Sequence, residues 1–373
     1  MMRTPLAEAL GLEVPIFAFS KAPAVVAAVS RAGGMGVLGA VAYTVAQLRE
    51  ALDWIDAHVD GKPYGVDVVM PMKYEGAGSG DLDPAKLEAM IPPRHRAFIE
   101  ELLARHGVPK LPEGVHEWHH LLAWTEQTTR PQVDLALERN IVLLANALGP
   151  PPRDIVDRAH ARGIKVAALT GAVDHALKHI ENGVDIVVAQ GTEAGGHCGE
   201  IATMVLVPEI VDAVGETPVL AAGGIGCGRQ VAAALALGAQ GAWTGSIWLT
   251  AEESDVTTRL QDKLLRARSK DTVRSKALTG KPARQLKTGW SEAWDDPGNP
   301  SPLPMPLQFM ATADATSRIF RHAEQGGPGP HELLTSPVGQ IVGRMNTSRP
   351  VAAIMEGLVR ELRETIQRMS AHT

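Results

Sequence analysis

One histidine follows a buried-strand pattern in a position that suits acid–base chemistry. The apolar run that ends at Gln190 is followed by the small residues 191–196, which lead directly to His197. An imidazole titrates near neutral pH, so a histidine on such a loop can act as a general base against a flat ligand. A structural histidine bonded to a backbone carbonyl is the alternative. The neighbouring Gly195 and Gly196 favour the catalytic interpretation.

Two glycine-containing segments follow later apolar strands and suit the binding of a phosphate group. They are Ala222-Gly223-Gly224 and Thr244-Gly245-Ser246. Backbone N–H groups in such loops can surround an anion, and the positive end of a following helix adds to the attraction. Ordinary turn glycines are the alternative for either segment alone. Because both segments end neighbouring strands, we predict that together they hold a phosphate, with the Ser246 hydroxyl as a further donor.

Two polar side chains within or at the end of apolar strands have less specific roles. Gln190 ends its strand, so its amide either recognises a ring at the mouth of the sheet or supports the fold. Asp67 lies inside another strand and poses the same question. A buried carboxylate without a partner costs free energy, so we expect Asp67 to find a hydrogen-bond donor.

The segment His116-Glu117-Trp118-His119-His120 matches the zinc-binding pattern H-E-x-x-H. On a helix, two histidines four residues apart share a face, and the glutamate can act as a base. The pattern is short, however, and Ala123 and Glu126 stand where the longer metalloprotease signature requires glycine and histidine. We therefore predict no metal site and interpret the segment as part of a histidine-rich lid.

The composition is typical of a cytoplasmic α/β protein that acts on small molecules. The 373 residues are 45% hydrophobic but only 4% aromatic, so the core relies on aliphatic side chains, which suits helix-covered parallel strands. The net charge of -6 without a basic cluster argues against nucleic-acid binding. Two cysteines fit a reducing compartment. Glu8, Glu13 and Arg31 interrupt the early apolar runs, so we expect neither a signal peptide nor a membrane span.

Eight apolar segments are expected to form strands: 14–19, 36–38, 64–70, 141–146, 165–169, 185–190, 218–222 and 241–245. Helices are expected between them at 23–32, 44–58, 152–162, 172–182 and 229–237. This alternation predicts a parallel sheet, and eight strands close a TIM (β/α)8 barrel. An open doubly wound sheet is the alternative. There the phosphate loop follows the first strand, whereas here it follows the seventh.

Two segments are longer than the connections that a barrel requires. Residues 71–130 lie between the third and fourth strands, and residues 251–335 form a helical, proline-rich extension after the eighth. Both leave from the carboxyl ends of strands, where barrels assemble active sites, so they are candidate lids or homodimer elements. We assign 1–250 and 336–373 to the barrel. The last part, 350–369, is expected to be an amphipathic helix.

At these segments the chain resembles the nitronate monooxygenase family, formerly called 2-nitropropane dioxygenases. It also resembles the flavin-dependent enoyl-acyl-carrier-protein reductases that share their barrel. The resemblance is carried by residues 190–197, 222–225 and 244–246, and more weakly by 280–284. It covers roughly residues 5 to 290. Residues 339–340 resemble a glycine-glutamine element that the family has near its end.

The resemblance implies a TIM barrel that holds FMN without a covalent bond. It implies the FMN phosphate at the two glycine segments and the ring lined by backbone groups at the end of the first strand. The full implied cofactor set is Ala18, Phe19, Ser20, Asp67, Gln190, Gly195, Gly196, Ala222, Gly223, Gly224, Thr244, Gly245, Ser246 and Gln340. His197 matches the catalytic histidine of the family.

The same resemblance implies oxidation of alkyl nitronates or nitroalkanes by dioxygen to a carbonyl compound and nitrite. His197 would accept the α-proton of a neutral nitroalkane or position an anionic nitronate. The alternative is an NAD(P)H-dependent FMN reductase of an enoyl or related unsaturated acyl substrate. The chain departs from the family pattern at Asp67, where asparagine is common, at Leu169, and at a first strand end that carries Phe17, Phe19 and Lys21.

Overall fold

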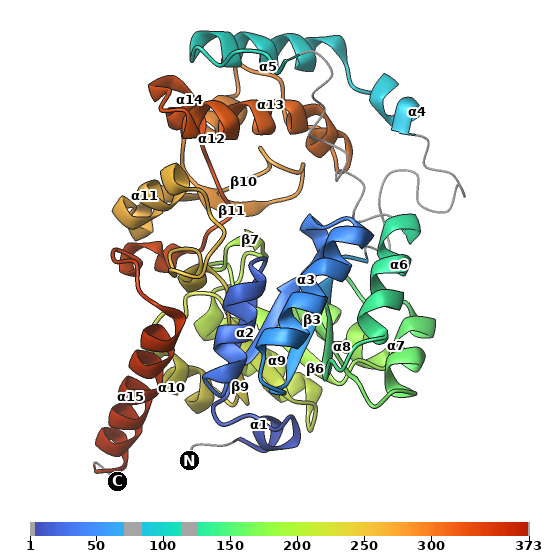
Figure 1. The fold of residues 1–373 in the computed structure, drawn as a ribbon, viewed down its shortest axis with the longest axis vertical. Coiled ribbons are helices and arrows are strands. Elements are labelled where there is room, and N and C mark those ends of the chain that lie inside the picture. Colours follow the sequence, from blue (N-terminus) through green and yellow to red (C-terminus); the bar gives the residue numbers. More distant parts are fainter. Residues whose placement is uncertain (1–3, 71–83, 113–125, 372–373) are drawn as a thin grey trace.

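The computed structural model describes residues 4–70, 84–112 and 126–371, and its centre is a closed barrel of eight parallel strands (Figure 1). In barrel order the strands are β1 (Ile16–Ser20), β2 (Met35–Gly39), β3 (Tyr64–Val68), β4 (Leu143–Asn146), β5 (Lys165–Thr170), β6 (Ile186–Gln190), β8 (Val219–Ala222) and β9 (Gly241–Thr244). Pairing of β1 with β9 closes the barrel. The predicted barrel is confirmed, and each expected strand ends within two residues of the observed one.

Alternation along each strand separates the interior of the barrel from the layer beneath the helices. On β3, for example, Tyr64, Val66 and Val68 pack under the helices, which turns Gly65 and Asp67 toward the interior. The interior is filled by Phe17, Met35, Val37, Leu143, Ala145, Ala167, Ile186, Val188, Leu220, Ala222 and Trp243. Leucines in and just after α1 (Pro5–Ala9) join this cluster, and α1 lies at the bottom of the barrel in Figure 1. The barrel is therefore a packed core that is closed at its amino end.

Helices surround the barrel, as the alternating pattern predicts. They are α2 (Pro23–Arg31), α3 (Val45–His58), α6 (Glu126–Leu137), α7 (Arg153–His160), α8 (Val173–Glu181), α9 (Thr203–Val214), α10 (Gly228–Ala236) and the final α15 (Val351–Ser370). Thr44 starts α3 through a reciprocal capping box with Gln47. Helix α9 is not predicted by the sequence patterns. Pro208 inside it and its nearly continuous apolar residues hide a helical period.

The predicted amphipathic helix at the end of the chain is confirmed. In α15, Val351, Ile354, Leu358 and Leu362 are buried, and the helix packs on α10 and α2. Within the described part of the chain, no helix combines the length and the apolar character that crossing a membrane requires.

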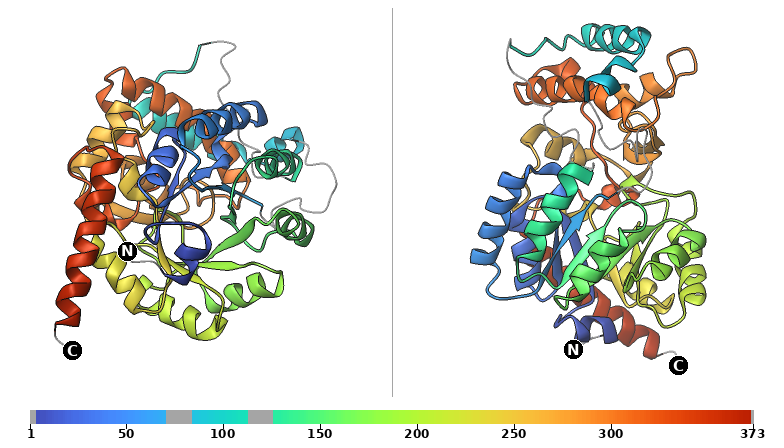
Figure 2. Two further views of the ribbon diagram at one scale, coloured as in Figure 1. Left: turned by 60° about the horizontal axis from the view of Figure 1, so that its bottom comes forward. Right: turned by 90° about the vertical axis from the view of Figure 1, so that its right-hand side faces the viewer.

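Described elements from the two segments that exceed the barrel lie together in a single lobe above the carboxyl ends of the barrel strands, as Figures 1 and 2 show. This cap lobe consists of α4 (Pro84–Ala89), α5 (Pro93–Arg105), α11 (Thr258–Arg266), β10 (Thr272–Ser275), β11 (Ala283–Leu286), α12 (Gly289–Asp295), α13 (Leu307–Glu324) and α14 (Pro328–Leu333). Arg318 of α13 joins the two insertions, because its guanidinium contacts Glu100 Oε1 of α5 at 2.6 Å and donates to the carbonyl of Pro109. Phe98 of α5 packs edge-on against Trp294 of α12.

A small antiparallel sheet connects the cap lobe to the barrel, and the sequence did not predict it. Its order is β10–β11–β7, where β7 is the two-residue strand Gly196–His197 in the loop after β6. In this sheet His197 is opposite Ala283, and Gly196 is opposite Arg284. The loop that carries the candidate base is therefore held by a strand about eighty residues further along the chain.

Candidate active site

Loops from three parts of the chain meet at the carboxyl end of the barrel. The N–H of Gly339 donates to Ser246 Oγ at 2.8 Å, and the N–H of Gln340 donates to the carbonyl of Glu193 at 2.9 Å. A Cβ at Gly195 would lie 2.7 Å from the nitrogen of Gly339, so only glycine permits this approach. The predicted residues Gly195, Ser246 and Gln340 are thus brought together, and Gly339, which was not among the predicted site residues, makes the contacts that join them.

The loop after β8 presents backbone donors that have no partner among the described residues. Gly223 and Gly224 have φ values of 100° and 68°, a conformation that favours glycine. This turn leaves the N–H groups of Gly224 and Ile225 without an acceptor among the described residues. Unpaired N–H groups at the start of a helix attract anions, and α10 begins at Gly228.

The loop after β9 faces the same space. A Cβ at Gly245 would meet only the ring of Phe19, at 3.9 Å, so the position opens onto free space. The Ser246 oxygen accepts from Gly339, which leaves its hydroxyl hydrogen available to another acceptor. We call the N–H groups of Gly224 and Ile225, together with Gly245 and Ser246, the anion cradle. Its unpaired donors and missing side chains fit a phosphate group.

Residues at the end of β1 divide between the interior and the outer layer. The ring of Phe19 covers Gly39, because a Cβ at Gly39 would lie 2.6 Å from it. Ala18 packs in the opposite direction, in the core beneath the helices. Ser20 Oγ accepts from the N–H of Ala22, which precedes α2. Only Phe19 therefore offers a side chain to the mouth of the barrel.

Three other predicted residues lie close to the mouth. Gln190 is half-buried. In β6, Ile186 and Val188 face the barrel interior, and alternation along the strand turns the Gln190 amide the same way. Ala222 is its register partner on β8 and belongs to the interior cluster. Thr244 has a structural role, because its buried hydroxyl donates to the carbonyl of Phe17 at 2.8 Å and accepts from the indole of Trp248.

Asp67 is a carboxyl group inside the barrel without a hydrogen bond at Oδ1 from any described residue. The side chain is 3% exposed, and burial raises its pKa to about 8. The expectation that it finds a donor is therefore wrong for Oδ1 within the described structure. The physical reason is its register, since the neighbours Gly39 and Ala145 have no polar side chain. At neutral pH Asp67 is an uncharged acid that can donate a hydrogen bond.

His197 is half-buried, and Nε2 of its ring lies 2.7 Å from Thr279 Oγ1. Its partner is thus a side-chain hydroxyl, not the backbone carbonyl of the alternative interpretation. Burial, with a smaller contribution from the positive charge of Lys281, lowers the pKa of His197 to about 4. The imidazole is consequently neutral at physiological pH and has a lone pair that can accept a proton.

Thr279 and Arg284 position this histidine and were not among the predicted site residues. The Thr279 hydroxyl also donates to the carbonyl oxygen of Lys281 at 3.3 Å, which leaves its oxygen free to accept from Nε2 of the imidazole. Arg284 donates from Nε to the carbonyl of Thr192 at 2.7 Å, which holds the loop before β7. The weak family match at 280–284 was the available signal.

The histidine-rich segment His116–His120 lies outside the described residues, so the zinc alternative is not placed in the structure. Within the described ranges, no three His, Cys, Asp or Glu side chains are grouped in a way that would hold a metal ion.

Comparison with known sequences extends over the whole chain. A family model described as nitronate monooxygenase matches residues 6–361. A Mycobacterium tuberculosis protein named "Putative monooxygenase" is 51% identical, with 98% of each chain covered. A "Probable nitronate monooxygenase" of Staphylococcus aureus is 30% identical over 97% of this chain and 98% of its own length.

Solved structures show the same architecture. A nitroalkane oxidase from Streptomyces ansochromogenes superposes with a TM-score of 0.78 at 25% identity, covering 97% of this chain and 99% of that one. FabK from Thermotoga maritima gives a TM-score of 0.71 at 26% identity, with both chains fully covered. The family match, its extent and the shared barrel show that the chain belongs to the nitronate monooxygenase family of flavin-dependent oxidoreductases.

Proposed function

We propose that this enzyme uses FMN and dioxygen to oxidise alkyl nitronates and nitroalkanes to carbonyl compounds and nitrite. The observation that carries the proposal is a neutral imidazole, that of His197, held on a loop whose Gly195 packs against Gly339, which in turn donates to Ser246 of the anion cradle. Two nitronate anions and one dioxygen give two carbonyl compounds and two nitrite ions, which conserves atoms and charge. Membership of the family supports the oxidation of nitro compounds.

The anion cradle would hold the FMN phosphate through the N–H groups of Gly224 and Ile225 and the Ser246 hydroxyl. Phe19 and Gln190 would lie at the mouth beside the ring system. The uncharged carboxyl of Asp67 can donate a hydrogen bond to an acceptor atom above the interior, which would satisfy a polar group that is otherwise unpaired. Bound FMN supplies the electron acceptor for the substrate.

His197 would remove the α-proton when the substrate is a neutral nitroalkane. With the ring proton on Nε2, its N–H can donate to Thr279 Oγ1 while the Thr279 hydroxyl donates to the carbonyl of Lys281, which leaves the lone pair on Nδ1 to accept the proton. When Nδ1 takes the proton, Nε2–H can keep its bond to Thr279. Thr279 is therefore a positioning residue. A nitronate already lacks the α-proton, so for that substrate the same imidazole only positions the anion.

A spectrum and a turnover assay test the proposal. We expect the purified protein to show flavin absorbance, to release FMN on denaturation, and to form nitrite from propyl-2-nitronate with uptake of dioxygen. A flavin-free protein that does not bind added FMN would contradict the cofactor assignment. A flavoprotein that forms no nitrite from any nitronate or nitroalkane would contradict the substrate.

The superposition with FabK favours one alternative, a flavin reductase that uses NAD(P)H. Anaerobic mixing separates the two functions. Rapid bleaching of the flavin by NADH or NADPH, without bleaching by a nitronate, would favour the reductase.

A further inference from the structure

We infer that Lys281 is the specificity-determining residue that binds the negative charge of a nitronate beside His197. This inference rests on the proposed function, because it assigns a further residue to the same site. It adds a specificity-determining cation to a site whose other proposed groups are an imidazole and hydrogen-bond donors.

Lys281 belongs to a turn that is fixed around the imidazole. Its N–H donates to Thr279 Oγ1 at 3.3 Å, and the same oxygen lies 2.7 Å from Nε2 of His197. Gly280 in this turn has a φ of 83°, and a Cβ there would overlap the carbonyl oxygen of Leu303 in the cap lobe. The turn therefore packs tightly between the cap lobe and the histidine. This packing fixes the backbone of Lys281 beside His197.

The ammonium group of Lys281 has no counter-ion in the part of the chain that the structure describes. The side chain is half-buried, and none of the described residues gives Nζ an ion pair or a hydrogen bond. The arginines of the neighbouring strands are occupied, because Arg274 contacts Glu200 at 2.8 Å and Arg284 donates to the carbonyl of Thr192. A partly buried cation without a partner costs free energy, so the binding of an anion beside it is favoured.

The imidazole and the lysine have different charges. His197 is neutral at physiological pH because its pKa is lowered, and the charge of Lys281 contributes to that lowering. The histidine therefore supplies no positive charge to a bound anion, whereas Lys281 does. A nitronate carries a full negative charge that this ammonium would stabilise, and a neutral nitroalkane gains much less.

Steady-state kinetics of three variants test the inference. Lys281→Gln removes the charge, Lys281→Arg keeps it, and Lys276→Gln removes an exposed lysine from the same connection as a matched control. For Lys281→Gln we expect KM for propyl-2-nitronate to rise about 10–100-fold, the usual effect of losing a hydrogen bond to a charged group. We expect KM for neutral 2-nitropropane to change less than about threefold. Lys281→Arg should stay within about tenfold of wild type for the nitronate, and Lys276→Gln should match wild type.

Two results would overturn the inference while leaving the proposed function intact. One is normal nitronate turnover with an unchanged KM in Lys281→Gln. The other is loss of FMN from that variant, which would place Lys281 at the cofactor. If Lys281→Gln does not fold, Lys281→Met preserves the length of the aliphatic stem and replaces it in the same assays.

Calorimetric titration with sodium nitrate, an unreactive planar anion, separates failure of the inference from failure of the proposed function. If wild type oxidises no nitronate but binds nitrate, and Lys281→Gln weakens that binding while Lys276→Gln does not, the anion site is supported and the reaction is rejected. Equal nitrate binding by wild type and Lys281→Gln would reject the anion site.

Discussion

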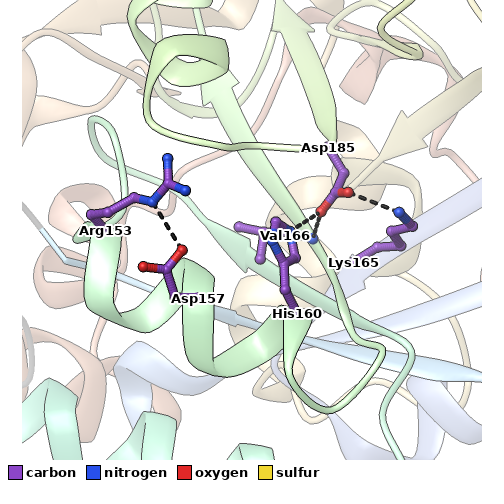
Figure 3. Close-up of polar contacts among 6 residues, drawn as sticks. All are labelled: Arg153, Asp157, His160, Lys165, Val166 and Asp185. Carbon is purple, nitrogen blue, oxygen red and sulfur yellow. Dashed lines mark hydrogen bonds and ion pairs between the residues drawn. The ribbon is translucent and has the colours of Figure 1, made fainter.

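Asp67 and Asp185 lie at opposite ends of the barrel and have opposite environments. Asp185 precedes β6 at the amino end, where its carboxylate accepts bonds of 2.8 Å each from His160 Nε2, Lys165 Nζ and the N–H of Val166 (Figure 3). Asp67 lies toward the carboxyl end of β3, and its Oδ1 receives no bond from the described residues. The amino end thus uses its carboxylate to join strands, whereas the carboxyl end leaves one unpaired.

The pKa of Asp185 is lowered and that of Asp67 is raised, because only Asp185 has hydrogen-bond donors around its carboxylate. Burial would raise the pKa of Asp185, but bonds from Lys165, Val166 and His160 lower it overall. Asp67 experiences burial without compensation, and its pKa is raised to about 8. Unpaired buried polar groups are uncommon in folded proteins and call for an explanation. A ligand-binding mouth at one end and a purely structural face at the other provides that explanation.

The largest expected difference between the two ends is in catalysis. His197→Asn at the mouth should lower kcat/KM for neutral nitroalkanes by about 10²–10⁴-fold, the usual contribution of a general base, and should retain the flavin. His160→Asn at the amino end is the matched control and should leave kcat/KM unchanged. Stopped-flow and steady-state assays measure both. Equal rates for wild type and His197→Asn would remove the imidazole from its role.

Retention of FMN should be lost on substitution at the carboxyl end of the barrel and kept on substitution at the amino end. Gly224→Asp should release FMN, because a carboxylate would enter the anion cradle and repel the phosphate. Gly215→Asp also replaces a glycine of positive φ, but in an exposed turn before β8 where a Cβ meets nothing within 4 Å, so it should keep FMN. The absorbance ratio of flavin to protein checks this. Full flavin content in Gly224→Asp would place the phosphate elsewhere.

Substitution of Asp185 at the amino end should change the stability of the fold. Asp185→Asn should lower the free energy of unfolding by about 1–3 kcal/mol near neutral pH, since charge-assisted hydrogen bonds from Lys165 and His160 are lost. Because the folded pKa of Asp185 is lowered, its stabilisation is present above the unfolded pKa and disappears as pH falls through the folded pKa. Denaturant titration across acidic pH should therefore show wild type and variant converging. A constant difference would contradict the assigned ion pairs.

The smallest expected effect concerns Asp67, whose contribution to stability changes with pH in the direction opposite to that of Asp185. Its folded pKa is raised, so its contribution to stability is complete below the unfolded pKa and is lost as pH rises through about 8. Ionisation should also weaken FMN binding about fivefold, roughly the effect of one hydrogen bond. Fluorescence titration of FMN from pH 6 to about 9 checks this. Asp67→Asn remains uncharged and should bind FMN independently of pH over that range; a slope equal to wild type would exclude Asp67.

The sequence predicted the barrel well because its signals are local. Each strand is a short apolar run, and most of the helices that follow have recognisable ends, such as Thr44 before α3. The order of elements then limits the topology, since parallel strands joined by helices close at eight. Helix α9 was missed because Pro208 and its uniformly apolar residues conceal the period.

The sequence by itself determined which loops carry glycine at the ends of β8 and β9, and it identified His197 as the candidate base. Only the tertiary structure decided what surrounds them. Thr279 reaches His197 across 82 positions of the chain, and Gly339 reaches Ser246 across 93. Among the residues that the structure describes, it also left Oδ1 of Asp67 and Nζ of Lys281 without partners. Periodicity and turn preferences act over a few residues, whereas pairing and burial depend on which distant segments the barrel and cap lobe bring together.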